Sequence, residues 1–190
     1  MRVAGTLTAI CLVVAAALGG VNAITEGKIA AINLANTEAS LKAVAVSEDC
    51  GFEPLKTDTT MTNAATSQGA KISEAYKVTL GGESAGYAFK IVASGSQGNI
   101  EMVVGVDADN AVTGVSIVDN KETAGIGSKV MENNALPSGV GVLDQFIGMS
   151  GAGTLAIGKG VDAISGATVS TTGVTKGVNA ALAVAEALAA

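Results

Sequence analysis

The chain has 190 residues, of which 48% are apolar and 15% are charged, with 17 acidic against 11 basic side chains. It contains no His and no Trp, which argues against histidine-based acid–base catalysis and against a basic, aromatic-rich surface for nucleic acid. Its two cysteines, Cys11 and Cys50, lie far apart in sequence, so a CxxC motif and a Cys/His metal site are excluded, and demanding chemistry would need a cofactor.

The N-terminal segment predicts a membrane anchor. Residues 3–24 carry no charged side chain, and as a helix they would be roughly 33 Å long, enough to cross the hydrocarbon core of a bilayer. Arg2 precedes this run, and Glu26 and Lys28 follow it, so the positive-inside tendency places the N-terminus in the cytoplasm. We therefore expect residues 1–25 to be a single-pass anchor of the cell (inner) membrane, with the rest of the chain on its outer side.

A cleaved signal peptide is the alternative interpretation of the same segment. Val21 and Ala23 offer the small residues that a signal peptidase requires. However, the apolar run is longer than the roughly 7 to 15 residues of a signal-peptide core, and it continues into a predicted helix over residues 26–41. Both features favour a retained anchor.

Residues 26–72 predict a stalk helix and an irregular connection. Apolar residues recur at helical spacing as far as Leu41, and a break follows where Gly51 and Pro54 interrupt the pattern. Residues 56–72 show no clear periodicity, so we expect them to be irregular.

Four runs rich in β-branched residues alternate partly between apolar and polar positions, which predicts strands. Glycine-rich turns and one turn rich in Asp and Asn separate them. The predicted strands cover residues 75–80, 87–94, 99–107 and 111–119. Their order indicates an antiparallel meander, and short apolar groups between residues 125 and 150 predict short helices at one edge of the sheet.

The C-terminal segment predicts an amphipathic helix over residues 170–190, with residues 170–172 as candidate N-caps. Its apolar face consists of Val174, Val178, Leu182 and Ala185. Grouped strands with helices at both ends indicate an α+β fold, in which a single N-terminal transmembrane helix precedes one antiparallel-sheet domain over residues 73–190 with a C-terminal helix.

Residues 162–170 read Asp-Ala-Ile-Ser-Gly-Ala-Thr-Val-Ser and lead into this last helix. A helix start presents unpaired backbone N–H groups and a partial positive charge, so a phosphate esterified to Thr168 would be stabilised there without a basic side chain. Gly166 and Ala167 would permit a close approach. The segment is therefore a candidate phosphate site.

A helix-capping segment is the other interpretation of these residues. Ser165, Thr168 and Ser170 could accept hydrogen bonds from the first N–H groups of the helix, and Asp162 could complement its dipole. Local composition alone favours capping, and the order of motifs along the whole chain reverses that preference.

Residues 162–168 resemble the flavinylation motif Asp-x-x-Ser/Thr-Gly-Ala-Thr/Ser, which occurs in the FMN-binding subunits of Rnf complexes and of Na⁺-translocating NADH:quinone oxidoreductases. Three further segments resemble the G subunit of the Rnf complex: residues 20–25, 122–127 and 143–146. These matches follow the family's order and extend over nearly the full length, so the sequence is similar to Rnf G subunits as a whole.

The resemblance implies that Thr168 carries FMN through a phosphoester to its side-chain oxygen. A separate, Mg²⁺-dependent flavin transferase would install the group from FAD. By the same resemblance, Asp162, Ser165, Gly166 and Ala167 would form the recognition context of Thr168. We expect no metal site in the chain itself, since it has no His and only two distant cysteines.

The segment after the fourth strand is the second candidate part of the site. By resemblance, Glu122, Thr123 and Gly125 would lie near the flavin. The sequence departs from the family at Ala124, where Pro is usual, so this loop is expected to be less rigid. Taken alone, residues 122–127 would be interpreted as an ordinary glycine-rich connection.

The function implied by the resemblance is that of a membrane-anchored electron-transfer subunit with covalent FMN, in an Rnf-type ferredoxin:NAD oxidoreductase complex coupled to ion translocation. It would be one part of a translocase and not a complete enzyme, and its partners would be the other membrane and soluble subunits. The alternatives are the C subunit of a Na⁺-translocating NADH:quinone oxidoreductase, whose chain is typically longer, and an anchored surface module without redox chemistry.

Overall fold

The computed structural model describes residues 2–47 and 49–189, and the side chains in these ranges except those of Arg2, Val3, Ala9, Ile29, Ala30 and Asn33. The Arg2 charge that orients the predicted anchor therefore lies outside the described side chains. The chain divides into two compact units, Met1–Asn36 and Thr37–Ala190. Residues 37–72, which the sequence assigns to a stalk and a connection, belong to the same unit as the sheet.

The first unit lies within helix α1, Arg2–Val44. Its stretch Ala4–Lys28 is long and apolar enough to cross a membrane, and none of it is buried inside the structure. A signal sequence satisfies the same criteria of length and composition. The structure thus supports a membrane-directed segment, and its retention as an anchor stays a prediction.

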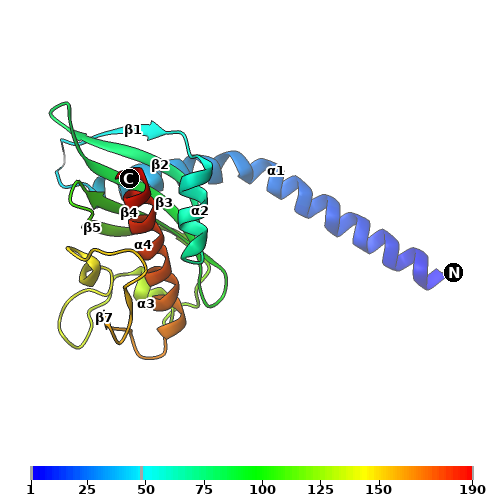
Figure 1. Ribbon diagram of the computed structural model, residues 1–190. Helices are drawn as coiled ribbons and strands as arrows, with labels where there is room; N and C mark the ends of the chain where they lie inside the picture. The colour runs from blue at the N-terminus through cyan, green and yellow to red at the C-terminus, as the bar shows by residue number, and fades with distance from the viewer. Residues whose placement is uncertain (1, 48, 190) are drawn as a thin grey trace. The chain divides into compact units, whose positions relative to one another are not determined.

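The second unit is built on a five-stranded antiparallel sheet with the order β1-β2-β3-β4-β5 (Figure 1). The four predicted strands and their meander are confirmed, and both β2 and β3 begin earlier than predicted, at Ala70 and Glu83. Gly81 and Gly82 have φ angles of 61° and 90°, which close a two-residue hairpin so that strand pairing continues up to the turn. The strands are β1 Gly51–Leu55, β2 Ala70–Leu80, β3 Glu83–Ser94, β4 Asn99–Asp107 and β5 Val112–Asn120.

The structure corrects the prediction for residues 51–72, which contain β1 and helix α2, Thr59–Ser67. β1 pairs only with β2, and an edge strand tolerates Pro54 because its outer N–H positions need no partner. α2 begins after Asp58, whose Oδ1 accepts a hydrogen bond of 2.8 Å from the N–H of Met61. The polar composition of the segment favours an irregular structure, although Asp58 is a typical N-cap residue.

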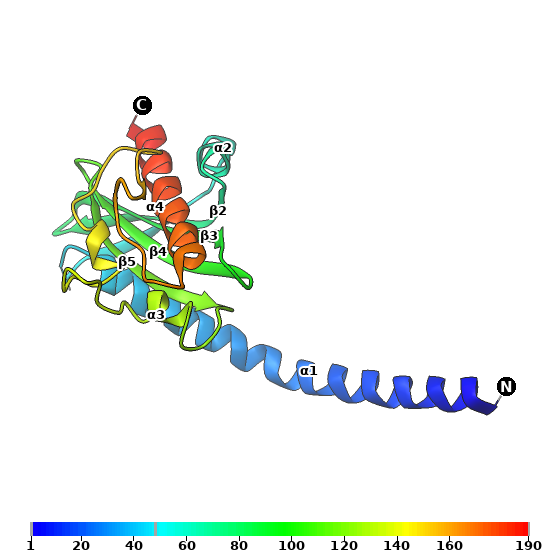
Figure 2. The ribbon, with the colours of Figure 1, turned by 90° about the horizontal axis from the view of Figure 1, so that it is seen from below.

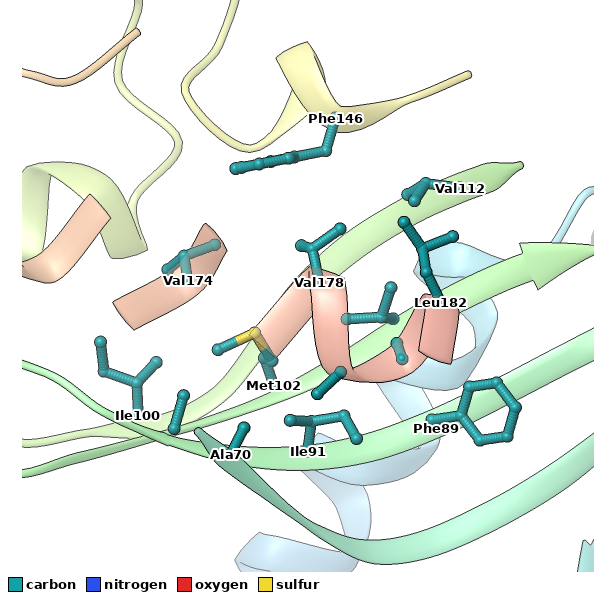
Figure 3. Close-up of a cluster of buried hydrophobic side chains, with 14 of the residues drawn as sticks. Ala70, Phe89, Ile91, Ile100, Met102, Val112, Phe146, Val174, Val178 and Leu182 are labelled. Atoms are coloured by element: carbon teal, nitrogen blue, oxygen red, sulfur yellow. The ribbon is translucent and has the colours of Figure 1, made fainter. Parts of the chain in front are cut away.

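Helix α4, Thr168–Ala189, packs across one face of the sheet, with α2 beside it (Figure 2). Its predicted apolar face is confirmed, since Val174, Val178, Leu182 and Ala185 are all fully buried. Figure 3 shows Val174, Val178 and Leu182 in one cluster with Ile91 and Met102 of the sheet. Between β5 and α4 the chain forms α3 Ser128–Met131, the 3-10 helix η1 Asp144–Phe146, and the short strands β6 Ala156–Ile157 and β7 Gly160–Val161.

The opposite face of the sheet receives the last turns of α1. Leu41 and Val44 are buried there in a second apolar cluster with Val103. The Thr113 hydroxyl donates a hydrogen bond of 2.6 Å to the carbonyl of Val44. The helix can approach this closely because Gly105 on the neighbouring strand has no side chain, and a Cβ there would lie 2.5 Å from the Val44 carbonyl oxygen.

Gly105→Ala is expected to destabilise the second unit by about 1–3 kcal/mol, since the new methyl group must displace backbone atoms of α1. In the full chain in detergent, circular dichroism should show a melting temperature roughly 2–10 °C lower than that of the wild type. Gly27→Ala is the matched control, because nothing lies within 4 Å of that position in the structure. Equal melting temperatures for the two variants would contradict this account of the contact.

Tyr76 and Glu74 form a hydrogen-bonded pair, and Tyr76 packs against the apolar cluster of Leu41 and Val44. The pair predicts an unusually high pKa for the tyrosine. Tyr76 donates a hydrogen bond to Glu74, and burial together with this bond raises the pKa of Tyr76 to about 12. Burial opposes ionisation of Glu74, but the hydrogen bond from Tyr76 and the charge of Lys90 outweigh it and keep the Glu74 pKa below its usual value. Because the unfolded chain releases the phenol proton near pH 10, stability should fall between about pH 10 and pH 12. Absorbance titration of the Tyr87→Phe variant, in which Tyr76 alone contributes, should show ionisation near pH 12, and a midpoint near 10 would refute the assignment.

Candidate functional site

The start of α4 lies at the end of the sheet where β3 and β5 terminate. A Cβ on Gly173, in the second turn of α4, would lie 2.6 Å from the carbonyl oxygen of Ser94, the last residue of β3. The missing side chain therefore lets the helix rest directly on the strand end. We refer to this end as the Asn120 end, after the last residue of β5.

Glu122 joins three segments at the Asn120 end. Its Oε1 accepts hydrogen bonds from the N–H groups of Ser96 (2.8 Å) and Gln97 (3.1 Å), in the turn between β3 and β4. Its Oε2 accepts a hydrogen bond from the Ser170 hydroxyl, in the first turn of α4. The structure thus brings the two predicted parts of the site together, although 48 positions separate Glu122 from Ser170.

Thr123 and Gly125 form a tight turn next to this carboxylate. The Thr123 carbonyl accepts hydrogen bonds from the N–H groups of Ile126 and Ser128, both at 3.2 Å. Gly125 has a φ of 75°, a left-handed conformation that disfavours any other residue. Both residues are exposed, so neither is part of the core, and the turn is available to a ligand.

The hydroxyl groups at the start of α4 differ in what they bind. Thr171, Thr172 and Thr175 each donate to the carbonyl four residues earlier, and Ser170 donates to Glu122. Thr168 is exposed, and among the residues that the structure describes none forms a hydrogen bond with its hydroxyl. Thr168 therefore presents an unengaged nucleophilic oxygen on the first helical residue.

The first backbone N–H groups of α4 have no side-chain cap. The first intrahelical bond runs from the N–H of Thr171 to the carbonyl of Ala167 (2.9 Å), which leaves the N–H groups of Thr168, Val169 and Ser170 without intrahelical partners. No described side chain accepts from them. The predicted N-caps at residues 170–172 are thus wrong, because these residues lie inside the helix.

The alternative capping interpretation of residues 162–170 is likewise not what the structure shows. Ser165 is exposed and forms no hydrogen bond with any described residue, and Ser170 donates its hydroxyl proton away from the helix N–H groups. Gly166 has a φ of 82° and open space where a Cβ would be. The helix start is therefore an open, donor-lined surface that could accept a phosphate group.

Gln145 of η1 holds the segment that leads to Thr168. The N–H of Asp162 donates to Gln145 Oε1 (2.8 Å), and Gln145 Nε2 donates back to the Asp162 carbonyl (3.0 Å). The sequence singled out residues 143–146 by resemblance and assigned them no role. The structure gives Gln145 a role, because its reciprocal pair of hydrogen bonds fixes the backbone of Asp162, whose side chain is exposed.

Sequence reasoning missed two glycines that pack against Glu122. A Cβ on Gly95 would lie 2.4 Å from Glu122 Oε1, and one on Gly127 would lie 2.4 Å from Glu122 Oε2. Gly127 stands in the segment that carries the resemblance, but Gly95 lies in an ordinary Gly-Ser-Gln-Gly turn. No local signal could show that this turn meets a carboxylate 26 residues further along the chain.

Each of the two predicted parts of the site exposes one large apolar side chain. Val169 is 60% exposed and follows Thr168 directly, and Ile126 is 52% exposed and lies in the turn next to Glu122. Exposed apolar side chains that neighbour a donor-lined helix start would suit a ligand with a phosphate and a flat apolar ring. Within residues 2–47 and 49–189, no group of three or more acidic or Cys side chains could hold a metal ion.

The chain is similar to known proteins over most of its length. Residues 95–183, which include every predicted site residue, match the model of the FMN-binding domain family. The chain is 32% identical over 184 residues to the G subunit of the Na⁺-translocating ferredoxin:NAD⁺ oxidoreductase complex of Acetobacterium woodii, covering 91% of this chain and 85% of that protein. It is 43% identical over 56 residues to the G subunit of an ion-translocating oxidoreductase complex of Aliivibrio fischeri, covering 29% of this chain and 27% of that protein. Among solved structures, the C subunit of a Na⁺-translocating NADH-quinone reductase from Parabacteroides distasonis aligns with a TM-score of 0.48 and 18% identity, covering 82% of this chain and 92% of that one.

Proposed function

Because the chain belongs to the family of G subunits of Rnf-type ion-translocating oxidoreductase complexes, we propose that it is an electron-transfer subunit whose FMN is bound covalently to Thr168. It would act as one subunit of a translocase that oxidises ferredoxin and reduces NAD⁺. This is the reaction in the name of the complex to which its relative from Acetobacterium woodii belongs. Bound FMN would supply the redox chemistry, which fits a chain without His.

The observation that carries this proposal is the state of Thr168. Its hydroxyl is exposed and forms no hydrogen bond with any described residue, whereas the hydroxyls of Thr171, Thr172 and Thr175 donate to carbonyls of the helix backbone. A phosphate on Thr168 would lie beside the unpaired N–H groups of the first turn, which favour negative charge. The residues present therefore fit a phosphoester-linked cofactor.

The neighbouring residues would serve the attachment and the bound group. Ser165 and Gly166 are exposed beside Thr168, so a flavin transferase could reach them as part of its recognition sequence, together with Asp162 and the buried Ala167. Residues 122–125 would hold the turn that borders the flavin. Val169 and Ile126 would provide apolar contact to its ring, which keeps water away from one side.

The last turns of α1 lie along β5. Within the second unit, Ser40 lies against Ser116 of β5, and Val44, further along α1, lies against Thr113. Residues 40–44 of α1 therefore run antiparallel to β5 within this unit. We propose that residues 1–25 anchor the chain and that the FMN-binding domain, predicted over residues 73–190, carries the electron-transfer site. Residues 37–72, predicted as a stalk and connection, belong to the same folded unit as the sheet.

The proposed sidedness makes a labelling prediction. With the N-terminus in the cytoplasm, Cys50 would lie outside the membrane, and a membrane-impermeant maleimide should label it in intact cells. The Cys11→Ala background removes the other cysteine of the chain. Labelling that appears only after the inner membrane is broken would reverse the proposed orientation, and a chain that lacks its first residues by intact mass would indicate a cleaved signal peptide.

The proposed function is tested by mass spectrometry of the full chain after co-expression with a flavin transferase. We expect the intact mass to increase by one FMN less water, and peptide mapping to place the increase on Thr168. An unmodified peptide beside a control substrate that the same transferase has modified would overturn the proposal and leave an anchored module without redox chemistry.

A further inference from the structure

Both oxygens of the Glu122 carboxylate accept hydrogen bonds from the protein itself. Ser96 and Gln97 donate to one oxygen and Ser170 to the other, so no oxygen of Glu122 is without a protein donor. Gly95 and Gly127 pack so closely against these oxygens that neither position has room for a Cβ. Protein donors thus occupy three of the roughly four acceptor positions of this carboxylate, which favours a structural role for the group.

The contact with Ser170 determines which way the first turn of α4 faces. Ser170 is 1% exposed and points inward toward Glu122, whereas Thr168 is exposed. Residues two apart on an α-helix project about 200° from each other, so a turn that is fixed by Ser170 on the inner side presents Thr168 on the outer side. The N–H groups of this turn have no side-chain cap, so the Glu122–Ser170 bond is the side-chain hydrogen bond that joins the turn to the segment after β5, in addition to the burial of Ala167 and Thr171.

We propose that Glu122 is a positioning residue that holds the Thr168 hydroxyl in place for modification and does not itself bind the cofactor. The inference rests on the proposed function and deepens it. In the attachment step, the Thr168 oxygen bonds to the FMN phosphorus of FAD, the phosphoanhydride bond breaks, AMP leaves, and the hydroxyl proton is lost to a base. A loose first turn would spend less time in the geometry that this displacement needs, and the step would slow.

The test is a time course of covalent flavin on the purified full chain, with FAD, Mg²⁺ and a flavin transferase, followed by fluorescence in denaturing gels. Glu122→Ala and Ser170→Ala should each slow the reaction roughly 10- to 100-fold. Glu122→Gln should be nearer to the wild type, since the amide can still accept from Ser96 and donate to Ser170. If the two residues act as one unit, the double variant should be no slower than Glu122→Ala alone.

Glu186→Ala is the matched control. Glu186 lies near the other end of α4 and also accepts a backbone hydrogen bond, from the N–H of Ala152 at 3.0 Å. Glu186→Ala removes a hydrogen bond between a glutamate side chain and a backbone N–H, as Glu122→Ala does. The rate of flavin attachment in this variant should equal that of the wild type. An equal slowing in this variant would show that the effect of Glu122 is general destabilisation, and would overturn the inference.

Hydrogen exchange provides a readout that needs no cofactor. In the unmodified chain, Glu122→Ala and Ser170→Ala should speed amide exchange in the peptide that spans residues 167–175, whereas Glu186→Ala should not. Faster exchange with an unchanged rate of flavin attachment would overturn the positioning role while the proposed function stands. A wild-type chain that accepts no flavin from an active transferase would instead overturn the proposed function, and this inference with it.

Discussion

Thr168→Ala is expected to abolish covalent flavin and to leave the domain folded. The substitution removes the one hydroxyl in residues 168–175 that is exposed and unengaged, and alanine is a better helix former than threonine. Denaturing gels of the variant co-expressed with a flavin transferase should show no fluorescent band, and intact mass should be that of the bare chain. Thermal unfolding should stay within a few degrees of the unmodified wild type.

Two further variants separate the attachment oxygen from its surroundings. Thr168→Ser keeps a hydroxyl at the same position and should retain flavin. Ser165→Ala removes the other exposed, unengaged hydroxyl of the motif, and flavin should remain on Thr168 even if attachment is slower. Flavin retained in Thr168→Ala would assign the linkage to another residue, and its loss in Ser165→Ala but not in Thr168→Ala would move the site to Ser165.

Helices and strands with a regular pattern of buried side chains, such as α4 and β4, could be predicted from the sequence. Val174, Val178 and Leu182 recur at helical spacing because α4 has a single buried face, and the predicted ends of β4 match the observed ones because turn residues bound it on both sides. The α+β class followed from the grouping of these elements. The family resemblance supplied the candidate site, since nothing local distinguishes Thr168 from a capping threonine.

The parts that were missed depend on contacts distant in sequence. β1 contains Gly51 and Pro54, which are unfavourable in strands. It forms a strand because it pairs with β2 at the edge of the sheet, where a proline without an N–H is tolerated. The resemblance placed Glu122 in the candidate site, but the hydrogen bonds that it accepts from Ser96, Gln97 and Ser170 are seen only in the structure. Composition and periodicity carry no information on such partners, whereas the structure fixes them.

Phe146 connects the core to the site, and its loss should cost more stability than any other change considered above. The ring is fully buried, and Figure 3 shows it in the same cluster as Val112 and Val178. Phe146→Ala would leave a cavity among α4, β5 and η1, and should lower the free energy of unfolding by about 3–5 kcal/mol. Circular dichroism of the full chain in detergent should show a melting temperature roughly 6–20 °C lower.

The adjacent residue gives the control and separates stability from site geometry. Ile147 is 54% exposed, so Ile147→Ala should change stability by no more than about 0.5 kcal/mol. Because η1 also carries Gln145, whose amide pairs with the backbone of Asp162, Phe146→Ala should in addition loosen the segment before Thr168 and slow flavin attachment at temperatures where the variant is still folded. If Phe146→Ala melts like Ile147→Ala, the ring does not hold η1 on the core, and the pairing of Gln145 with Asp162 must be maintained by other contacts.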